Sequence, residues 1–275
     1  MIEIKKVKIT KGETPILADI YYQKQNNKKL ILFCHGFKGF KDWGCWHLVA
    51  KAFAEAGFIF LKFNFSHNGV GQENPLDFTR LDLFFKNNYS REGDDLKKVL
   101  EWSKTAEEIK SLDIKERCLI GHSRGGGIVI QSTVELKEIY KLATWASISH
   151  FDRFGDKKMI ADWKKEGSRS FYNSRTQQDM KIGVQFYEDY LVNHSRLDLE
   201  KAAKQLKKPY LIVHGKRDDA VGFSHAQRLN HWCTNSQLHL IEDANHVFGA
   251  KHPHTEDHLP NHLNEVVEET IKFFN

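Results

Sequence analysis

The sequence lacks the features that mark membrane and secreted proteins. No apolar run approaches the ~20 residues that a bilayer-spanning helix needs, and the mean hydropathy is low, at -0.54. The 275-residue chain begins with a charged, alternating segment, residues 1–6, which has none of the apolar core of a secretory signal. The sequence therefore predicts a cytoplasmic protein with no membrane partner.

Disulfide patterns and basic blocks are also absent. None of the four cysteines is in a C-x-x-C spacing, which agrees with reduced thiols in the cytoplasm. The net charge is only +5, and lysines alternate with acids rather than with aromatic residues. We therefore expect no disulfide framework and no nucleic-acid partner.

Signatures of bound metals and cofactors are missing as well. Histidines recur near the C-terminus, and His258 and His262 have a spacing that can place two ligands on one helix face. However, Pro253 and Pro260 interrupt this segment, and no cysteine lies nearby to complete a structural zinc site. We interpret the segment as a solvated loop and expect neither a metal nor an organic cofactor.

The clearest positive feature is the segment Gly121–Gly125, which reads Gly-His-Ser-Arg-Gly. It follows a short apolar segment, residues 117–120, and precedes a segment that can form a helix. In this setting G-x-S-x-G makes a sharp, strained turn that lifts the serine hydroxyl above the edge of a sheet. A Cβ at either flanking glycine would crowd the turn. Ser123 is therefore the candidate nucleophile.

An acid should follow this serine along the chain, after a late strand. The apolar segment 210–214 leads into Asp218 and Asp219. The G-x-x-D spacing from Gly215 favours Asp218 as the acid, with Asp219 as the alternative.

A histidine should follow the acid. The segment 237–241 resembles the last strand of a sheet, and His246 comes directly after it. We therefore predict that His246 is the base for Ser123. His35 and His122 lie beside glycines and are expected to support turns rather than to transfer protons.

Acyl transfer also needs N–H groups that bind a developing oxyanion. The apolar segment 30–34 leads into a glycine-containing loop, residues 35–39. The predicted donors are the backbone N–H groups of Phe37 in this loop and of Arg124, the residue after Ser123.

Taken together, the segments 35–37, 121–126, 215–218 and 245–246 resemble the serine α/β-hydrolase family. The chain is similar to esterases of the cinnamoyl and feruloyl type and to serine aminopeptidases, from about residue 28 to the C-terminus. It departs from the family at Arg124, where glutamine or methionine is more usual. The resemblance implies an α/β-hydrolase fold, no cofactor, and a small-molecule ester or amide substrate.

Strand-like and helix-like segments alternate along the chain, which favours an α/β fold with a mostly parallel central sheet and helices on both faces. Segments 3–10 and 16–23 are expected to form an antiparallel hairpin at the sheet edge. Residues 91–104 are expected to form a helix with Ser90 as its N-cap. Further strands are expected at 29–34, 58–65, 116–122, 142–149, 210–214 and 237–241, and further helices at 43–55 and 259–274.

Residues 151–208 break this alternation. They are rich in charged and aromatic residues and show no strand pattern, and α/β-hydrolases insert caps at this point. We predict a core domain of residues 1–150 and 209–275 and a small, mostly helical cap, residues 151–208, over the active site. The aromatic residues of the cap and of the loop 66–89 are expected either to line a pocket or to pack these segments onto the core.

The leading functional interpretation is hydrolysis of a small carboxylic ester through an acyl-enzyme. One alternative is amide or peptide cleavage of the aminopeptidase kind, which requires carboxylates that capture a free amine; Asp179, Glu188 and Asp189 are candidates. Another is a non-catalytic ligand-binding protein on a hydrolase scaffold, against which the complete triad argues. Nothing in the sequence specifies the substrate or the oligomeric state.

Cationic residues occur in three of these loops: Arg124, Lys38, and the pair Lys216 and Arg217. If their charges converge, they favour an anionic ester. The alternative, which we prefer, is that Arg124 pairs internally with Asp219 or another acid while the lysines are solvated.

Overall fold

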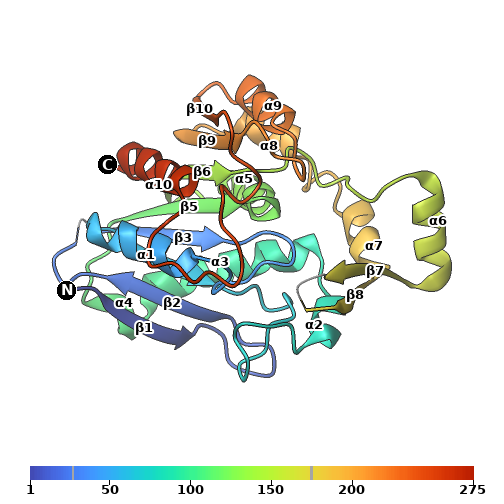
Figure 1. Ribbon diagram of the computed structural model, residues 1–275, viewed down its shortest axis with the longest axis horizontal. Helices are drawn as coiled ribbons and strands as arrows, with labels where there is room; N and C mark the ends of the chain where they lie inside the picture. Colours follow the sequence, from blue (N-terminus) through green and yellow to red (C-terminus); the bar gives the residue numbers. More distant parts are fainter. Residues whose placement is uncertain (27, 174–175) are drawn as a thin grey trace.

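Eight strands form one sheet in the computed structural model, which describes residues 1–26, 28–173 and 176–275. The strands are β1 (Glu3–Lys8), β2 (Leu17–Tyr22), β3 (Lys29–Cys34), β4 (Ile59–Phe63), β5 (Glu116–His122), β6 (Ile139–Trp145), β9 (Tyr210–Gly215) and β10 (Ser236–Ile241). Their order across the sheet is β1-β2-β4-β3-β5-β6-β9-β10 (Figure 1). The loops that follow β3 and β5 therefore lie at the middle of one sheet edge.

Two strand pairs at one edge of the sheet are antiparallel. β1 and β2 are antiparallel, with Glu3 opposite Tyr22, and β2 is antiparallel to β4. The other pairs described in this sheet are parallel. Parallel strands are covered on both faces and so read as continuous apolar runs, as in β3, whose residues 30–34 are all apolar and buried. The predicted parallel sheet with an antiparallel hairpin at its edge is confirmed.

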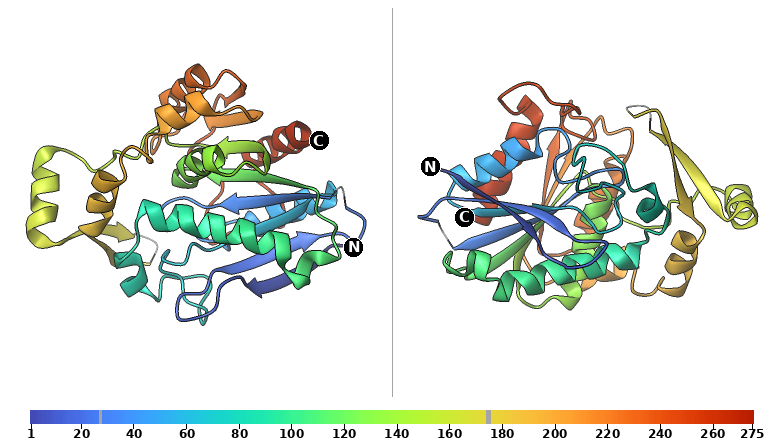
Figure 2. Two further views of the ribbon diagram at one scale, coloured as in Figure 1. Left: turned by 180° about the vertical axis from the view of Figure 1, so that it is seen from behind. Right: turned by 90° about the horizontal axis from the view of Figure 1, so that it is seen from below.

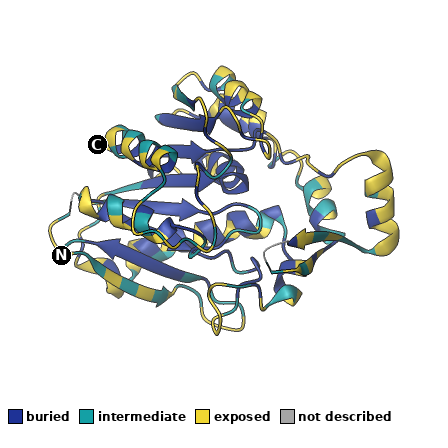
Figure 3. Ribbon diagram, viewed as in Figure 1, coloured by how far each residue is buried: buried dark blue, intermediate teal, exposed yellow. Residues whose placement is uncertain are grey.

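Helices cover both faces of the sheet (Figure 2). One face carries α1 (Trp46–Glu55) and α10 (Asn261–Phe274); the other carries α3 (Tyr89–Thr105), α5 (Arg124–Glu135), α8 (Leu199–Gln205) and α9 (Ser224–Trp232). The central strands are buried, and the helices expose their outer sides (Figure 3). Two short helices, α2 (Leu81–Phe85) and α4 (Glu107–Lys110), flank α3. None of the helices described here is long and apolar enough to cross a membrane.

The start of α3 differs from the prediction. Its N-cap is Asn88, whose side chain accepts a hydrogen bond of 2.8 Å from the amide of Arg91, and Ser90 lies inside the helix. The helix begins earlier because Tyr89 is buried, with ring centroids 4.4 Å from Phe151 and 4.5 Å from Phe186.

The segment 151–208 contains an antiparallel strand pair that the sequence did not predict. β7 (Ser168–Asn173) and β8 (Gln178–Gly183) lie between α6 (Lys157–Glu166) and α7 (Gln185–Val192). Apolar residues are buried mainly on β8, as at Met180 and Ile182, so β7 alone shows little alternation. These four elements project from the sheet (Figure 1). The last helix of the segment, α8, packs instead on α5.

The two chain ends lie on the side of the molecule opposite the projecting elements, in all the views of Figures 1 and 2. β3 and β5 run away from the ends and toward the projecting elements. The loops after these strands therefore lie far from both ends.

Candidate active site

Ser123 occupies the turn between β5 and α5. Its φ of 56° and ψ of -119° place it in left-handed backbone that residues with a Cβ rarely adopt. A Cβ on Gly121 would lie 2.4 Å from the carbonyl oxygen of Gly125, and one on Gly125 would lie 2.3 Å from that of Cys34. The turn therefore needs glycine at both positions to bring the serine this close to the end of β3.

Ser123, His246 and Asp218 form one chain of hydrogen bonds. His246 Nε2 lies 3.0 Å from Ser123 Oγ, and His246 Nδ1 lies 2.7 Å from Asp218 Oδ2. Because a carboxylate only accepts, Nδ1 carries the proton, and Nε2 is free to accept the proton of the hydroxyl. Asp219, the alternative acid, is exposed to solvent. Thus, the structure brings together the three residues selected from the sequence.

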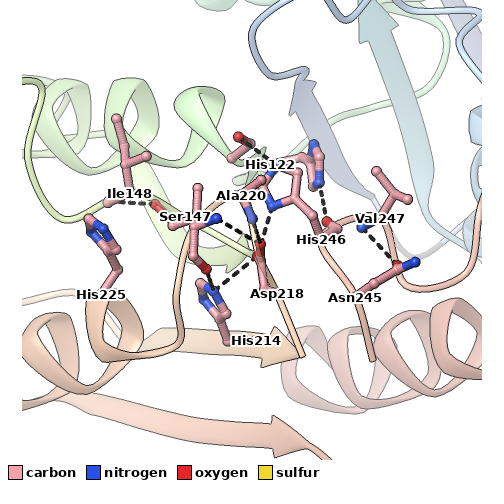
Figure 4. Close-up of polar contacts among 12 residues, drawn as sticks. His122, Ser147, Ile148, His214, Asp218, Ala220, His225, Asn245, His246 and Val247 are labelled. Atoms are coloured by element: carbon pink, nitrogen blue, oxygen red, sulfur yellow. Dashed lines mark hydrogen bonds and ion pairs between the residues drawn. The ribbon is translucent and has the colours of Figure 1, made fainter. Parts of the chain in front are cut away.

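The carboxylate of Asp218 lies between His246 and a second histidine, His214 (Figure 4). His214 Nε2 donates to the carbonyl of Val221 at 2.7 Å and lies 3.2 Å from Asp218 Oδ2. The amides of Ala220 and Val221 donate to Asp218 Oδ1 at 2.9 and 2.7 Å. Burial alone would raise the pKa of Asp218, but the hydrogen bonds from His214 and His246 hold it well below its usual range.

His214 is a site residue that our sequence analysis missed. The available signal was its position: it ends an otherwise apolar run, Tyr210–Val213, four residues before the acid. It is fully buried, so its ring is held in one orientation beside Asp218.

Two further histidines support the loops around Ser123. His122 Nε2 donates to the carbonyl oxygen of His246 at 2.9 Å, which holds the loop after β10 against the end of β5. Burial lowers the pKa of His122 to about 3. His35 Nδ1 lies 2.9 Å from the carbonyl oxygen of Gly36, and burial lowers the pKa of His35 to about 4. Both rings are therefore neutral near pH 7.

The loop after β3 packs directly against Ser123. A Cβ on Gly36 would lie 2.8 Å from Ser123 Cβ. Within the described part of the chain, the N–H groups of Phe37 and Arg124 have no protein acceptor. Both predicted oxyanion donors are thus available to a ligand.

A ring of four charges, of which Asp19, Lys41 and Lys62 are buried, anchors this loop to the sheet. Lys41 Nζ lies 2.7 Å from Asp19 and 2.5 Å from Asp42, and Lys62 Nζ pairs with the same two carboxylates. Lys62 is on β4 and Asp19 on β2, so the ring joins the loop to the antiparallel edge. Breaking a buried pair leaves an uncompensated charge, and the loop is therefore held firmly.

The cations selected from the sequence are largely neutralised. Arg124 pairs with the buried Glu92 of α3 at 2.5 Å, so it pairs internally with an acid other than Asp219. Lys216 and Arg217 pair with exposed acids that follow β10. Lys38 donates to a backbone carbonyl of β7. These four residues therefore do not form a common cationic site.

Two pockets meet at Ser123 and share Phe37, Ser123 and His246. The first, of ≈ 300 Å³, we name the histidine pocket; its walls include His35, Trp43, Trp46, His122 and His252. The second, of ≈ 320 Å³, we name the arginine pocket; its walls include Arg124, Arg153, Phe154, Trp163, Arg169 and Phe186. The aromatic residues of segment 151–208 therefore both pack together and line a pocket.

The acids considered for capture of a free amine lie elsewhere. Asp179 accepts from Ser170, and Asp189 accepts from the amide of Ser90. Neither they nor Glu188 are among the described residues that line the two pockets.

The C-terminal histidines make hydrogen bonds with backbone groups. His252 accepts from the amide of Gly44, and His254 Nε2 donates to the carbonyl of His258. Over residues 1–26, 28–173 and 176–275, no three His, Cys, Asp or Glu side chains are grouped as a metal site would require.

Comparisons with known proteins agree with this fold. No curated protein matches the sequence. Similar solved structures include Est1E from Butyrivibrio proteoclasticus (18% identity, TM-score 0.68, 98% of this chain and 97% of that chain) and a dienelactone hydrolase from Anabaena variabilis (15%, 0.63, 99% and 97%). The Pyrococcus furiosus esterase Pf2001 is also similar (19%, 0.63, 99% and 90%).

A family model, that of the prolyl oligopeptidase family, matches residues 48–269. The match spans most of the chain and includes the segments that carry Ser123, Asp218 and His246. With the α/β-hydrolase fold described above, it places the chain in a family of hydrolases: this protein is an α/β-hydrolase that belongs to the prolyl oligopeptidase family.

Proposed function

We propose that the protein is a serine hydrolase that cleaves a small carboxylic ester through an acyl-enzyme, with Ser123 as nucleophile, His246 as base and Asp218 as acid. The observation that carries this proposal is the unbroken hydrogen-bond chain from the buried Asp218 to the Ser123 hydroxyl, at the junction of two pockets. A turn serine without a catalytic role has no need of a strained backbone beside an oriented imidazole.

In this mechanism Ser123 Oγ attacks the ester carbonyl while His246 Nε2 takes the hydroxyl proton. Asp218 holds the Nδ1–H tautomer and stabilises the imidazolium. The N–H groups of Phe37 and Arg124 stabilise the oxyanion of the tetrahedral intermediate; loss of one such donor typically raises the barrier by roughly 3–4 kcal/mol. His246 then protonates the leaving alcohol, and water releases the acyl group by the same route.

The division into a core of residues 1–150 and 209–275 and a cap of residues 151–208 is part of this proposal. The elements up to α7 supply walls of the arginine pocket, such as Trp163 and Phe186. α8 does not belong with these elements, because it packs on α5 of the core and buries Ala202 and Ala203. We therefore assign substrate selection to the part of the cap that precedes α8.

Amide cleavage remains the second candidate, because the family model is named for a peptidase. The sign of charge around Ser123 favours an ester over an aminoacyl substrate. The arginine pocket has guanidinium groups in its walls and no carboxylate among the described lining residues to hold a free amine. The solved structures with similar folds include proteins named as esterases and a lipase.

The test combines active-site labelling with substrate comparison. A fluorophosphonate probe is expected to label the wild type and the Ser111→Ala control, in which an exposed serine is removed, but not Ser123→Ala. The wild type should hydrolyse p-nitrophenyl acyl esters faster than aminoacyl p-nitroanilides. Retention of more than about a tenth of the esterase activity by Ser123→Ala would contradict the mechanism, since loss of the nucleophile typically costs on the order of 10⁶ in turnover.

A further inference from the structure

The arginine pocket carries positive charge that no carboxylate among the described residues balances. Of its three arginines, Arg124 is paired with Glu92. No carboxylate of the described residues is within ion-pair distance of Arg153 or Arg169. The described lining includes no aspartate or glutamate. Two guanidinium charges are therefore available at the pocket wall.

Neutral groups hold these two guanidinium groups in place. Arg153 donates to the carbonyl of Ala220 at 2.8 Å and lies 3.2 Å from His225 Nε2. Arg169 donates to the carbonyl of Phe154 at 2.7 Å and lies over the ring of Phe171, 5.1 Å from its centroid. Each guanidinium has five N–H donors, so each keeps donors for a ligand while its orientation is fixed.

Apart from the three arginines, Tyr89, Ser123 and His246, the described residues of the pocket wall are apolar. Phe154, Trp163 and Phe186 are buried and contact one another, with ring centroids 6.2–6.4 Å apart. Such walls desolvate a ligand, and removing a dianion from water costs more than removing a single charge. A carboxylate suits this setting because it has one charge and accepts two parallel hydrogen bonds from a guanidinium.

We propose that the arginine pocket binds a carboxylate at the end of a short apolar or aromatic group, so that the preferred ester is a carboxylated one, such as a half-ester of a dicarboxylic acid. This inference rests on the proposed function, because Ser123 and His246 line the same pocket. With a volume of ≈ 320 Å³, the pocket limits the distance between the carboxylate and the scissile bond to a short chain.

The first experiment compares mono-p-nitrophenyl glutarate with p-nitrophenyl pentanoate, which has the same number of acyl carbons and no charge. The spontaneous hydrolysis of each is subtracted. We expect kcat/KM to be roughly ten- to a hundredfold higher for the glutarate, as for a hydrogen-bonded charge pair. The advantage should shrink as salt rises. A second pair, the butyrate esters of 4-hydroxybenzoate and 4-hydroxybenzamide, tests a carboxylate on the alcohol side.

Variants then connect the preference to the two arginines. In Arg153→Gln and Arg169→Gln the ratio of kcat/KM for the charged and neutral esters should fall toward one. Arg169→Lys keeps the positive charge but cannot donate two parallel hydrogen bonds to a carboxylate. This variant should therefore keep part of the preference for the charged ester. The control is Arg196→Gln, which removes a cation between α7 and α8 that already pairs with Glu135; its ratio should equal that of the wild type.

The outcomes separate this inference from the proposed function. If the wild type hydrolyses neutral esters through Ser123 but prefers the neutral member of both pairs, the inference is wrong and the proposed function stands. An unchanged ratio in the Arg153→Gln, Arg169→Gln double variant would also overturn it. If Ser123→Ala hydrolyses both esters like the wild type, the proposed function itself fails. The wild-type ratio decides the question even where a variant does not fold.

Discussion

The two pockets that meet at Ser123 are built from different parts of the chain. The histidine pocket is formed largely by loops that follow β3, β5 and β10, and its histidines His35 and His122 are neutral because they are buried. The arginine pocket is formed largely by the segment between Arg153 and Phe186, and its guanidinium groups stay charged. One pocket thus depends on the sheet for its geometry, and the other depends on an insertion.

This difference suggests a division of labour. Groups that move protons must be held closely, and the loops of the histidine pocket are fixed by buried rings and by the charge ring of Lys41 and Lys62. Groups that select a substrate need only present the correct surface, and an insertion can change without disturbing the sheet. Substitutions in the first pocket should therefore reduce turnover, and substitutions in the second should change preference.

After the loss of the Ser123 nucleophile itself, the largest effect on turnover is expected at the acid. Asp218→Asn should reduce kcat by about 10⁴, because the neutral amide no longer fixes the Nδ1–H tautomer of His246. Asp219→Asn is the matched control, and its kcat should stay close to that of the wild type. The measurement is kcat for p-nitrophenyl butyrate with both variants. Equal, mild losses in the two would remove Asp218 from the triad.

The next effect concerns the glycine turn. Gly125→Ala places a Cβ 2.3 Å from a backbone carbonyl, which cannot move aside as a side chain can. The free energy of unfolding should fall by about 3 kcal/mol, at the upper end for overpacking, and ester hydrolysis should fall with it. Gly222→Ala is the control, since its Cβ would find its nearest atom at 4.0 Å. Urea unfolding of both variants tests this; equal stabilities would show that the turn can relax.

A smaller effect is expected from pH. The pKa of His122 is lowered to about 3 in the folded state, so below about 6.5 the unfolded chain binds a proton that the folded chain does not. The contribution of the neutral His122 ring to the free energy of unfolding is fully present above pH 6.5. It is lost as the pH falls toward 3, by up to about 1.4 kcal/mol per pH unit. His122→Gln should therefore flatten the fall of stability between pH 6.5 and 4.5. Parallel curves for the variant and the wild type in this range would contradict the burial argument.

The smallest effect should arise in the arginine pocket. Phe171 lies on β7, with its ring 5.1 Å from that of Phe37 and 5.1 Å from the Arg169 guanidinium. Phe171→Leu should change the ratio of kcat/KM for butyrate and octanoate esters by roughly tenfold, as for a small change in an apolar pocket. Tyr172→Leu is the control on the same strand, since Tyr172 is 59% exposed. If Tyr172→Leu shifts the ratio as much, the effect is not specific to the pocket.

The sequence predicted the features that depend on local patterns. The turn at Ser123 with the strand β5 before it, and the loop at Phe37 with the strand β3 before it, are each encoded within a few residues, by glycines next to apolar runs. It did not predict the partner of Arg124, because Glu92 approaches from another helix. The β7–β8 pair was missed because its alternation is short, and Asn88 was missed because a buried Tyr89 extends the helix. No sequence pattern around Arg153 or Arg169 indicates their proposed role, which follows only from how the segment 151–208 folds.

The position of the chain ends has a practical consequence. Both ends lie on the side of the molecule opposite the projecting elements and the loops around Ser123 (Figure 1). A fluorescent protein, a second enzyme or a solid support joined to either end would therefore leave the mouths of both pockets open to solution. Attachment through the termini would present every immobilised molecule with its reactive side outward, which suits this protein to flow reactors and to fusion with an enzyme that uses its product.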